Sequence, residues 1–164
     1  MRATRIEAVL TRLSQGQVEF VVIGGVAALA QGLARVTFDV DVCYRRTREN
    51  IERLCQILTP LHPALRGAPP DIPFKLDVST VEAGLNFTLS TDLGDLDLLG
   101  EVAGLGEYDA LQAASETLPL YGMPMQVLTL DGLLTAKRAA GRHKDTETII
   151  ELEALLELRK RPPG

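Results

Sequence analysis

Apolar residues recur along the chain at two spacings, and the switch between them predicts where helices and strands lie. Over residues 4–14 they recur every three or four positions, which predicts an amphipathic helix that Gly16 ends. Residues 18–23 form an apolar, β-branched run, which is typical of a buried strand. The same patterns predict further strands over residues 37–44, 74–79, 86–90, 95–99 and 125–128. They predict further helices over residues 26–31, from Thr47 onward, and over residues 131–140 and 145–158.

The order of these elements places most strands in the middle of the chain and helices at its end. This order predicts an α+β fold with a mixed sheet and helices packed against it. Five prolines between residues 60 and 73 predict a loop or an irregular crossover there. The 164 residues suit one domain, so we expect residues 1–164 to form a single domain with residues 129–158 as its C-terminal helical part.

Composition and charge narrow the classes of protein that fit this pattern. Hydrophobic residues make up 46% of the chain, which is enough for a packed core. The net charge of −5 argues against tight, nonspecific binding to nucleic acid. The chain shows no apolar run long enough to span a bilayer and no signal-peptide pattern, so we expect a cytoplasmic protein. Cys43 and Cys55 lack metal-type spacing, and we expect both to be free, buried thiols.

A pair of glycines follows the first predicted strand and is the first candidate for chemistry. Gly24 and Gly25 stand between that strand and the next predicted helix. Glycine allows the backbone to approach a ligand closely, and free N–H groups at a helix start favour a phosphate. Taken alone, such a pair is more commonly explained by a tight turn that needs glycine for steric reasons. The pair matches neither a dinucleotide-binding fingerprint nor a P-loop.

Acidic residues alternate with apolar ones in two predicted strands, and these are the second candidate. Asp39 and Asp41 are two positions apart, so they point to the same face of their strand. Two adjacent carboxylates repel each other unless a cation or solvent compensates them, and Mg²⁺ prefers such oxygen ligands. Asp95 and Asp97 repeat the pattern in a later strand, and could lie beside the first pair if the strands are neighbours. A solvated polar face on each strand is the alternative interpretation.

The order of these motifs resembles the DNA polymerase β-like nucleotidyltransferase superfamily. The matching stretches are Val22-Ile23-Gly24-Gly25, then Arg35-Val36-Thr37-Phe38-Asp39-Val40-Asp41, then Gly94-Asp95-Leu96-Asp97-Leu98-Leu99. A late stretch, from Lys137 to Asp145, resembles one that recurs in small bacterial members, including toxin-type nucleotidyltransferases of abortive-infection and toxin–antitoxin systems. The resemblance covers about residues 18–155, as an order of motifs.

The resemblance implies a nucleotidyltransferase fold and an enzyme that moves a nucleoside monophosphate from an NTP to an acceptor hydroxyl, releasing pyrophosphate. It implies two Mg²⁺ ions, held by Asp39, Asp41 and Asp97 as catalytic and metal-binding residues. Asp97 is implied rather than Asp95 because the family pattern places the acid before two apolar residues. Gly24 and Gly25 are implied to cradle the phosphates of the nucleotide.

Basic residues supply further candidates for nucleotide binding. The resemblance makes Arg35 and Lys137 candidates, although Arg35 could instead brace the acidic strand. Arg142 and Lys144 could contact a phosphate or could be solvated residues at a helix end, and the sequence does not choose between these roles. The family often has a further acid where this chain has Thr148.

The acceptor and the biological role stay open at this stage. The acceptor hydroxyl could belong to tRNA, to a protein, or to a small molecule such as an aminoglycoside. The toxin-type resemblance implies that the protein could be a toxin with an antitoxin-type protein partner. The alternative from another class is a non-catalytic nucleotidyltransferase-like module that binds nucleotide or a partner protein. Three intact acids argue against that alternative, because an idle site has no physical reason to keep them.

Overall fold

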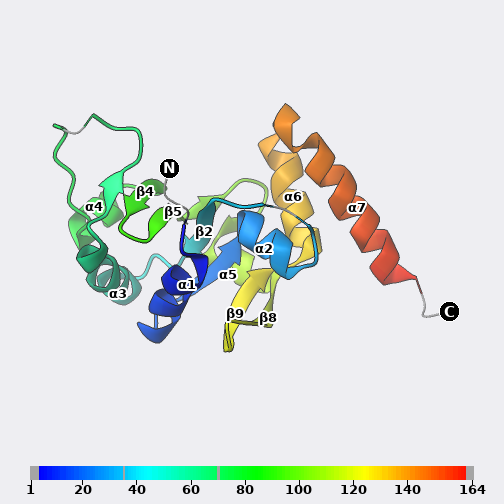
Figure 1. Cartoon of the computed structure of the whole chain (residues 1–164), viewed down its shortest axis with the longest axis horizontal. Helices are drawn as coiled ribbons and strands as arrows, with labels where there is room; N and C mark the ends of the chain where they lie inside the picture. Colours follow the sequence, from blue (N-terminus) through cyan, green and yellow to red (C-terminus); the bar gives the residue numbers. More distant parts are fainter. Residues whose placement is uncertain (1–3, 35, 70, 162–164) are drawn as a thin grey trace.

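The computed structural model describes residues 4–34, 36–69 and 71–161, and a mixed β-sheet forms its centre (Figure 1). Its strands are β1 Phe20–Ile23, β2 Asp39–Tyr44, β3 Ala64–Leu65, β4 Phe87–Thr91, β5 Gly94–Leu99, β8 Ser115–Leu120 and β9 Met123–Leu128. They form one seven-stranded sheet in the order β3-β4-β5-β2-β1-β9-β8. Two further short strands, β6 Glu101–Val102 and β7 Gly106–Glu107, pair with each other outside this sheet.

Helices of the described ranges surround the sheet and also form the C-terminal part of the chain. The α-helices are α1 Ile6–Gln15, α2 Gly24–Ala30, α3 Arg48–Leu58, α4 Val78–Ala83, α5 Tyr108–Ala113, α6 Leu130–Ala140 and α7 Thr146–Lys160. Short 3-10 turns lie at η1 Thr59–Leu61 and η2 His143–Asp145. Figure 1 shows α6 and α7 side by side at one end of the molecule. The predicted α+β class, mixed sheet and C-terminal helical segment are confirmed.

The two acidic strands, β2 and β5, lie side by side at the centre of the sheet. β2 is antiparallel to β1 on one side and parallel to β5 on the other. In the register of β2 and β5, Asp39 lies opposite Asp95 and Asp41 lies opposite Asp97. The predicted neighbourhood of these two strands is therefore confirmed, and it brings four carboxylates onto one face of the sheet.

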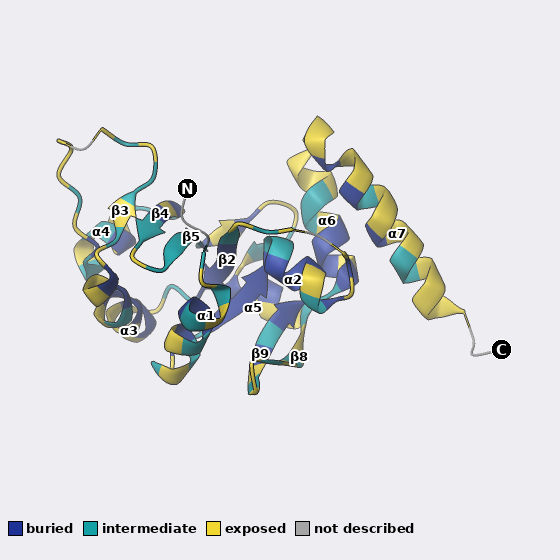
Figure 2. Ribbon diagram, viewed as in Figure 1, coloured by how far each residue is buried: buried dark blue, intermediate teal, exposed yellow. Residues whose placement is uncertain are grey.

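Burial of the opposite face fixes this register. Val40 and Val42 on β2, and Leu96 and Leu98 on β5, have no exposed surface. In Figure 2 these two strands carry the colours of buried and intermediate residues and none of exposed ones. Burying one such side chain contributes about 1.5–3 kcal/mol. A slip of one residue would exchange these apolar side chains for aspartates, so the core holds the carboxylates where they are.

Two predicted helix boundaries depend on caps that the structure contains. The Thr47 hydroxyl accepts a hydrogen bond from the Asn50 N–H at 3.3 Å, and α3 begins directly after it. Gly141 ends α6 with a φ of 62°, in the left-handed region that favours glycine. Cys43 and Cys55 are free and buried, as predicted. Within the described ranges, every helix is too short or too polar to cross a membrane.

The predicted strand over residues 74–79 is wrong. Phe74, Leu76 and Val78 alternate with polar residues as in a strand, yet the segment is irregular and then enters α4. The side chain of Asp77 accepts a hydrogen bond from the Thr80 N–H at 2.8 Å, so this acid caps a helix start. A capping bond to the local backbone outweighed the alternating pattern.

Several elements were not predicted. α5, β6, β7 and β8 lie in a stretch of the chain, residues 101–120, that has no clean periodicity. β8 contains Pro119, which cannot donate a backbone hydrogen bond, and it lies at the edge of the sheet. α2 also begins earlier than predicted, at Gly24 itself.

Candidate active site

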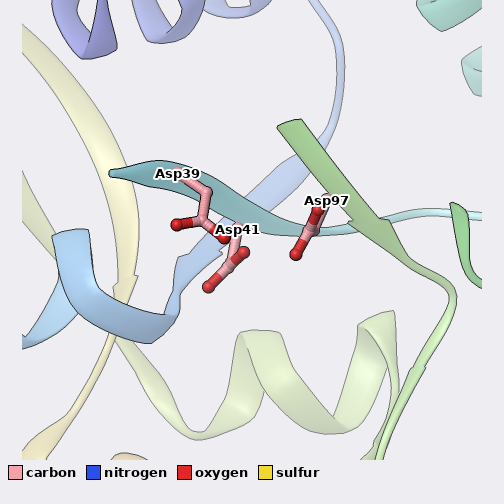
Figure 3. Close-up of side chains that lie close together, drawn as sticks. All are labelled: Asp39, Asp41 and Asp97. Atoms are coloured by element: carbon pink, nitrogen blue, oxygen red, sulfur yellow. The ribbon is translucent and has the colours of Figure 1, made fainter. Parts of the chain in front are cut away.

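Three of the aspartates converge where β2 and β5 run side by side. Each of Asp39, Asp41 and Asp97 offers a carboxylate oxygen, and these three oxygens lie within 4.8 Å of one another. Figure 3 shows the side chains projecting from the two neighbouring strands toward a common region. We call this group the aspartate triad. All three residues are half-buried, so the charges are only partly solvated.

Asp41 is the central and most perturbed member of the triad. Burial raises the pKa of its carboxyl from 3.8 to about 7, and the neighbouring Asp97 and Asp39 carboxylates act in the same direction, while Lys137 opposes them. Its Oδ1 atom is buried and has no hydrogen-bond partner among the described residues. A buried, unpartnered carboxylate oxygen beside two further carboxylates fits a hard divalent cation such as Mg²⁺. The donor set of the triad therefore fits the metal that the resemblance implies.

The glycine pair lies directly against the acidic strand, and this close packing explains why both residues are glycine. Gly24 has a φ of 64°, and a Cβ atom there would lie 2.1 Å from Oδ2 of Asp41. A Cβ atom on Gly25 would lie 2.7 Å from Oγ1 of Thr37. Glycine is therefore required for the close approach of the turn to the acidic strand, which is the steric explanation.

A cavity of about 370 Å³ opens between the glycine pair and the C-terminal helices. Its lining combines Asp39 and Asp41 with three basic residues, Lys137, Arg142 and Lys144. We call it the basic cavity. Phosphates are the ligands that such a combination of cationic side chains and a glycine turn favours. Lys137, Arg142 and Lys144 are thus brought together, although the sequence assigned a nucleotide role only to Lys137.

Asp145 holds two of these basic residues in place. It accepts hydrogen bonds from Nζ of Lys137 at 3.2 Å and from Nε of Arg142 at 2.6 Å. Burial acts to raise the pKa of Asp145, but these two bonds outweigh it and the pKa lies below its usual value. Sequence analysis assigned Asp145 no role of its own. Its signal was its place at the end of the late basic stretch, directly after Lys144.

A second cavity, of about 300 Å³, adjoins the first and shares Asp41, Lys137 and Arg142 with it. It reaches Asp41 and Asp97, and most of the rest of its lining is apolar. That apolar lining consists of Ile23, Leu99, Val102, Ala103, Leu128, Leu133, Ala136 and Ala140. We call it the apolar cavity. Sequence analysis missed it because Val102 and Ala103 belong to the stretch whose elements were not predicted.

Arg66 is a residue of the site that sequence analysis missed. Its Nη2 atom lies 2.6 Å from Oδ1 of Asp97, and its Nε atom lies 3.5 Å from Oδ2 of Asp95. The residue belongs to the proline-rich segment, where the sequence offered no pattern to place it. Asp95 therefore faces an arginine and lies outside the triad. The other predicted basic residue, Arg35, lies outside the described residues.

Comparison with known proteins places this geometry in a wider group of structures. No family model and no curated protein sequence matches the chain. A protein from Thermotoga maritima provisionally assigned as a nucleotidyltransferase superposes with a TM-score of 0.56 at 18% identity, over 98% of each chain. The lincosamide antibiotic adenylyltransferase LnuA, solved with lincomycin bound, has a TM-score of 0.60 at 13% identity over 94% of this chain and 99% of its own.

A third similar structure is ANT(2")-Ia in complex with adenylyl-2"-tobramycin. Its TM-score is 0.56 at 14% identity, over 90% of this chain and 82% of its own. At identities this low the superpositions establish a shared architecture, and they extend over nearly the whole chain. The resemblance seen in the order of motifs is therefore borne out in three dimensions: the chain has the nucleotidyltransferase fold.

Proposed function

We propose that this protein is a Mg²⁺-dependent enzyme that moves a nucleoside monophosphate from an NTP to an acceptor hydroxyl and releases pyrophosphate. The single observation that carries the proposal is the aspartate triad, whose buried, unpartnered oxygen lies beside one cavity with three cationic residues and a second, mainly apolar cavity. Phosphoryl transfer needs positioning and charge neutralisation more than a protein nucleophile. The triad, the glycine turn and the basic residues supply these two requirements.

The triad would hold the divalent cations. Asp39 and Asp41 would share both ions, and Asp97 would bind the one on the acceptor side. When bound, such ions neutralise the charge of the transferred group and favour ionisation of an acceptor hydroxyl. The half-buried setting strengthens the attraction of the carboxylates for a cation, because fewer water molecules screen it.

The basic cavity would take the triphosphate. Gly24 and Gly25 allow phosphates to approach the backbone at the start of α2, and Lys137 stands across the cavity from them. Arg35 stays a predicted nucleotide contact from the sequence. Lys137 and Arg142 are oriented by Asp145, so they are pre-organised for an anion before the nucleotide binds.

The apolar cavity would take the acceptor, because its lining includes Asp97 and that of the basic cavity does not. Its size, about 300 Å³, suits part or all of a small molecule. Its apolar walls favour an apolar body that carries a hydroxyl. Its charged lining residues besides the triad are the cations Lys137 and Arg142, which disfavour a polycationic acceptor. We therefore propose a small, largely apolar alcohol rather than tRNA, a protein or an aminoglycoside.

Incubation with each α-labelled NTP, Mg²⁺ and a cell extract tests this function. The extract is separated beforehand into RNA, protein and small-molecule fractions, and Asp41→Asn serves as the inactive control. We expect label in a product of low molecular mass that is retained on an apolar column. Label in RNA or protein would refute the proposed acceptor but leave the enzyme. Nucleotide binding without transfer to any fraction would indicate the non-catalytic module instead. A toxin role and an antitoxin-type partner stay predictions of the sequence resemblance.

A further inference from the structure

Arg66 reaches the acidic face from the edge of the sheet, and backbone pairing determines how. Leu65 on β3 pairs with Leu89 on β4, and the N–H of Arg66 donates to the Thr88 carbonyl at 2.9 Å. Thr88 itself pairs with Asp97 on β5. The pairing of β3 with β4 therefore delivers the arginine side chain across the sheet to the acidic strand.

The guanidinium meets three different carboxylates through its three nitrogens. Nη2 lies 2.6 Å from Oδ1 of Asp97 and donates to the Leu89 carbonyl at 2.8 Å. Nε lies 3.5 Å from Oδ2 of Asp95, and Nη1 lies 3.9 Å from Oδ2 of Asp39. The Arg66 side chain is only 30% exposed. A guanidinium stays charged at all physiological pH values, so this is a fixed positive charge among the acids.

This fixed positive charge affects Asp97 and Asp41 differently. Oδ1 of Asp97 is committed to a short bond with Arg66, which leaves its other oxygen for a cation. The buried Oδ1 atom of Asp41, in contrast, has no partner among the described residues. The guanidinium would repel a divalent ion held by Asp97 more than one held by Asp39 and Asp41, because it contacts Asp97 at 2.6 Å and approaches Asp39 only to 3.9 Å.

We propose that Arg66 is a positioning residue that orients Asp97 and lowers the affinity of the acceptor-side position for a divalent ion. The phosphates of a bound nucleotide would add the negative charge that offsets the guanidinium. The acceptor-side ion would thus bind well only once nucleotide is present. This inference rests on the metal site of the proposed function. The competing explanation is that Arg66 only anchors β3 and the segment after it to the sheet.

Binding of Mn²⁺ in the absence of nucleotide separates the two explanations, because it needs no transfer activity. Paramagnetic resonance and calorimetry on the full chain would compare the wild type with Arg66→Gln. We expect Arg66→Gln to bind Mn²⁺ about tenfold more tightly, since a repelling charge near the ion is removed. We also expect Mn²⁺ to raise the melting temperature of this variant more than that of the wild type.

Two further variants make the experiment decisive. Arg45→Gln removes an arginine that bridges Glu19 at 3.3 Å and Asp109 at 3.4 Å, away from the triad, and should leave Mn²⁺ affinity unchanged. Arg66→Lys keeps the positive charge but loses the several N–H donors of the planar guanidinium. It should bind Mn²⁺ with an affinity between those of wild type and Arg66→Gln. It also serves as the test variant if Arg66→Gln does not fold.

Equal or weaker Mn²⁺ binding by both Arg66 variants would overturn the inference, as would a failure of every form of the protein to bind Mn²⁺. Tighter binding combined with no transfer in any variant would refute the proposed function while leaving the role of Arg66 intact.

Discussion

The basic cavity and the apolar cavity share Gly24, Asp41, Leu133, Lys137 and Arg142, and they differ in the rest of their linings. The basic cavity, about 370 Å³, is lined by three cationic side chains and by the glycine turn. The apolar cavity, about 300 Å³, is lined mainly by leucine, valine and alanine side chains. The contrast is what the proposed enzyme requires, because we propose that it takes an anion in the first cavity and an apolar molecule in the second.

A single helix supplies part of both linings. On α6, Lys137 borders both cavities, whereas Ala136 and Ala140 border only the apolar cavity. Neighbouring positions on a helix point in directions about 100° apart, so one turn can present a cation to one ligand and a methyl group to another. Substitutions on this helix and on the glycine turn should therefore affect the two ligands separately.

Gly25→Val should have the largest effect on nucleotide binding. A Cβ atom at Gly25 already lies 2.7 Å from Oγ1 of Thr37, and a valine would also block a phosphate from the turn. Loss of two charge-assisted bonds to phosphate corresponds to about 100-fold weaker NTP binding. Calorimetry with ATP and Mg²⁺ measures it, and a melting curve checks the fold. Wild-type affinity in a folded Gly25→Val protein would remove the glycine turn from the nucleotide site.

Lys137→Gln should weaken NTP binding by about tenfold, because one charge-assisted contact is lost. Acceptor binding should change less. Arg138→Gln is the matched control, since Arg138 is adjacent but pairs with Glu153 at 3.1 Å on an exposed surface. Fluorescence titration with a labelled ATP analogue gives the nucleotide affinity of both variants. Equal effects of the two substitutions would mean that general charge, rather than the cavity, governs nucleotide affinity.

Ala136→Leu should act on the opposite side, by filling part of the apolar cavity. We expect the KM for the acceptor fraction to rise about tenfold while NTP affinity is unchanged, a size typical of a methylene-scale change in an apolar pocket. Ala154→Leu, on the exposed side of α7, is the control for adding the same side chain. If Ala136→Leu instead weakens NTP binding alone, the apolar cavity holds the nucleobase.

The smallest effect concerns the dependence of stability on pH without divalent ions. The pKa of Asp41 is about 7 in the folded protein and 3.8 when unperturbed, so the folded state keeps a proton that the unfolded chain releases. The contribution of Asp41 to the free energy of unfolding therefore falls as the pH rises from about 4 to about 7.

The substitution Asp41→Asn removes this dependence. At pH 7.5 in EDTA, we expect the Asp41→Asn variant to melt higher than wild type by on the order of 5 °C, and we expect the gap to shrink toward pH 5. Differential scanning calorimetry across this range measures it. A gap that widens at low pH would contradict the assigned direction of the pKa shift.

The sequence predicted the structure correctly where the periodicity of apolar residues determines it. The alternation of Asp39 and Asp41 with valines, and of Asp97 with leucines, determines which face each carboxylate takes, because a buried face cannot accept them. That β2 and β5 are neighbours followed only from the resemblance, since no local pattern specifies a pairing partner. The site was therefore predictable wherever it is built on alternating strands.

The rest of the site depends on contacts between segments without periodicity. Arg66 reaches Asp97 only because β3, two residues long, pairs with β4. Asp77 turned a strand-like stretch into a helix start through one capping bond. Val102 and Ala103 line the apolar cavity from a stretch whose short elements leave no clear sequence pattern. Such contacts are tertiary, so a single sequence carries little trace of them.

A comparison of Asp97→Asn with Asp95→Asn decides whether the aspartate triad is the catalytic metal site. The two residues are two positions apart on the same face of β5 and both pair with Arg66, at 2.6 Å for Asp97 and 3.5 Å for Asp95, but only Asp97 belongs to the triad. Single-turnover release of pyrophosphate from ATP, with Mg²⁺ and the small-molecule fraction, gives both rates. We predict that Asp97→Asn lowers the rate by on the order of 10³ while ATP still binds, and that Asp95→Asn keeps most of the rate. An inactive Asp95→Asn beside an active Asp97→Asn, or full activity in both, would contradict the assignment of the triad.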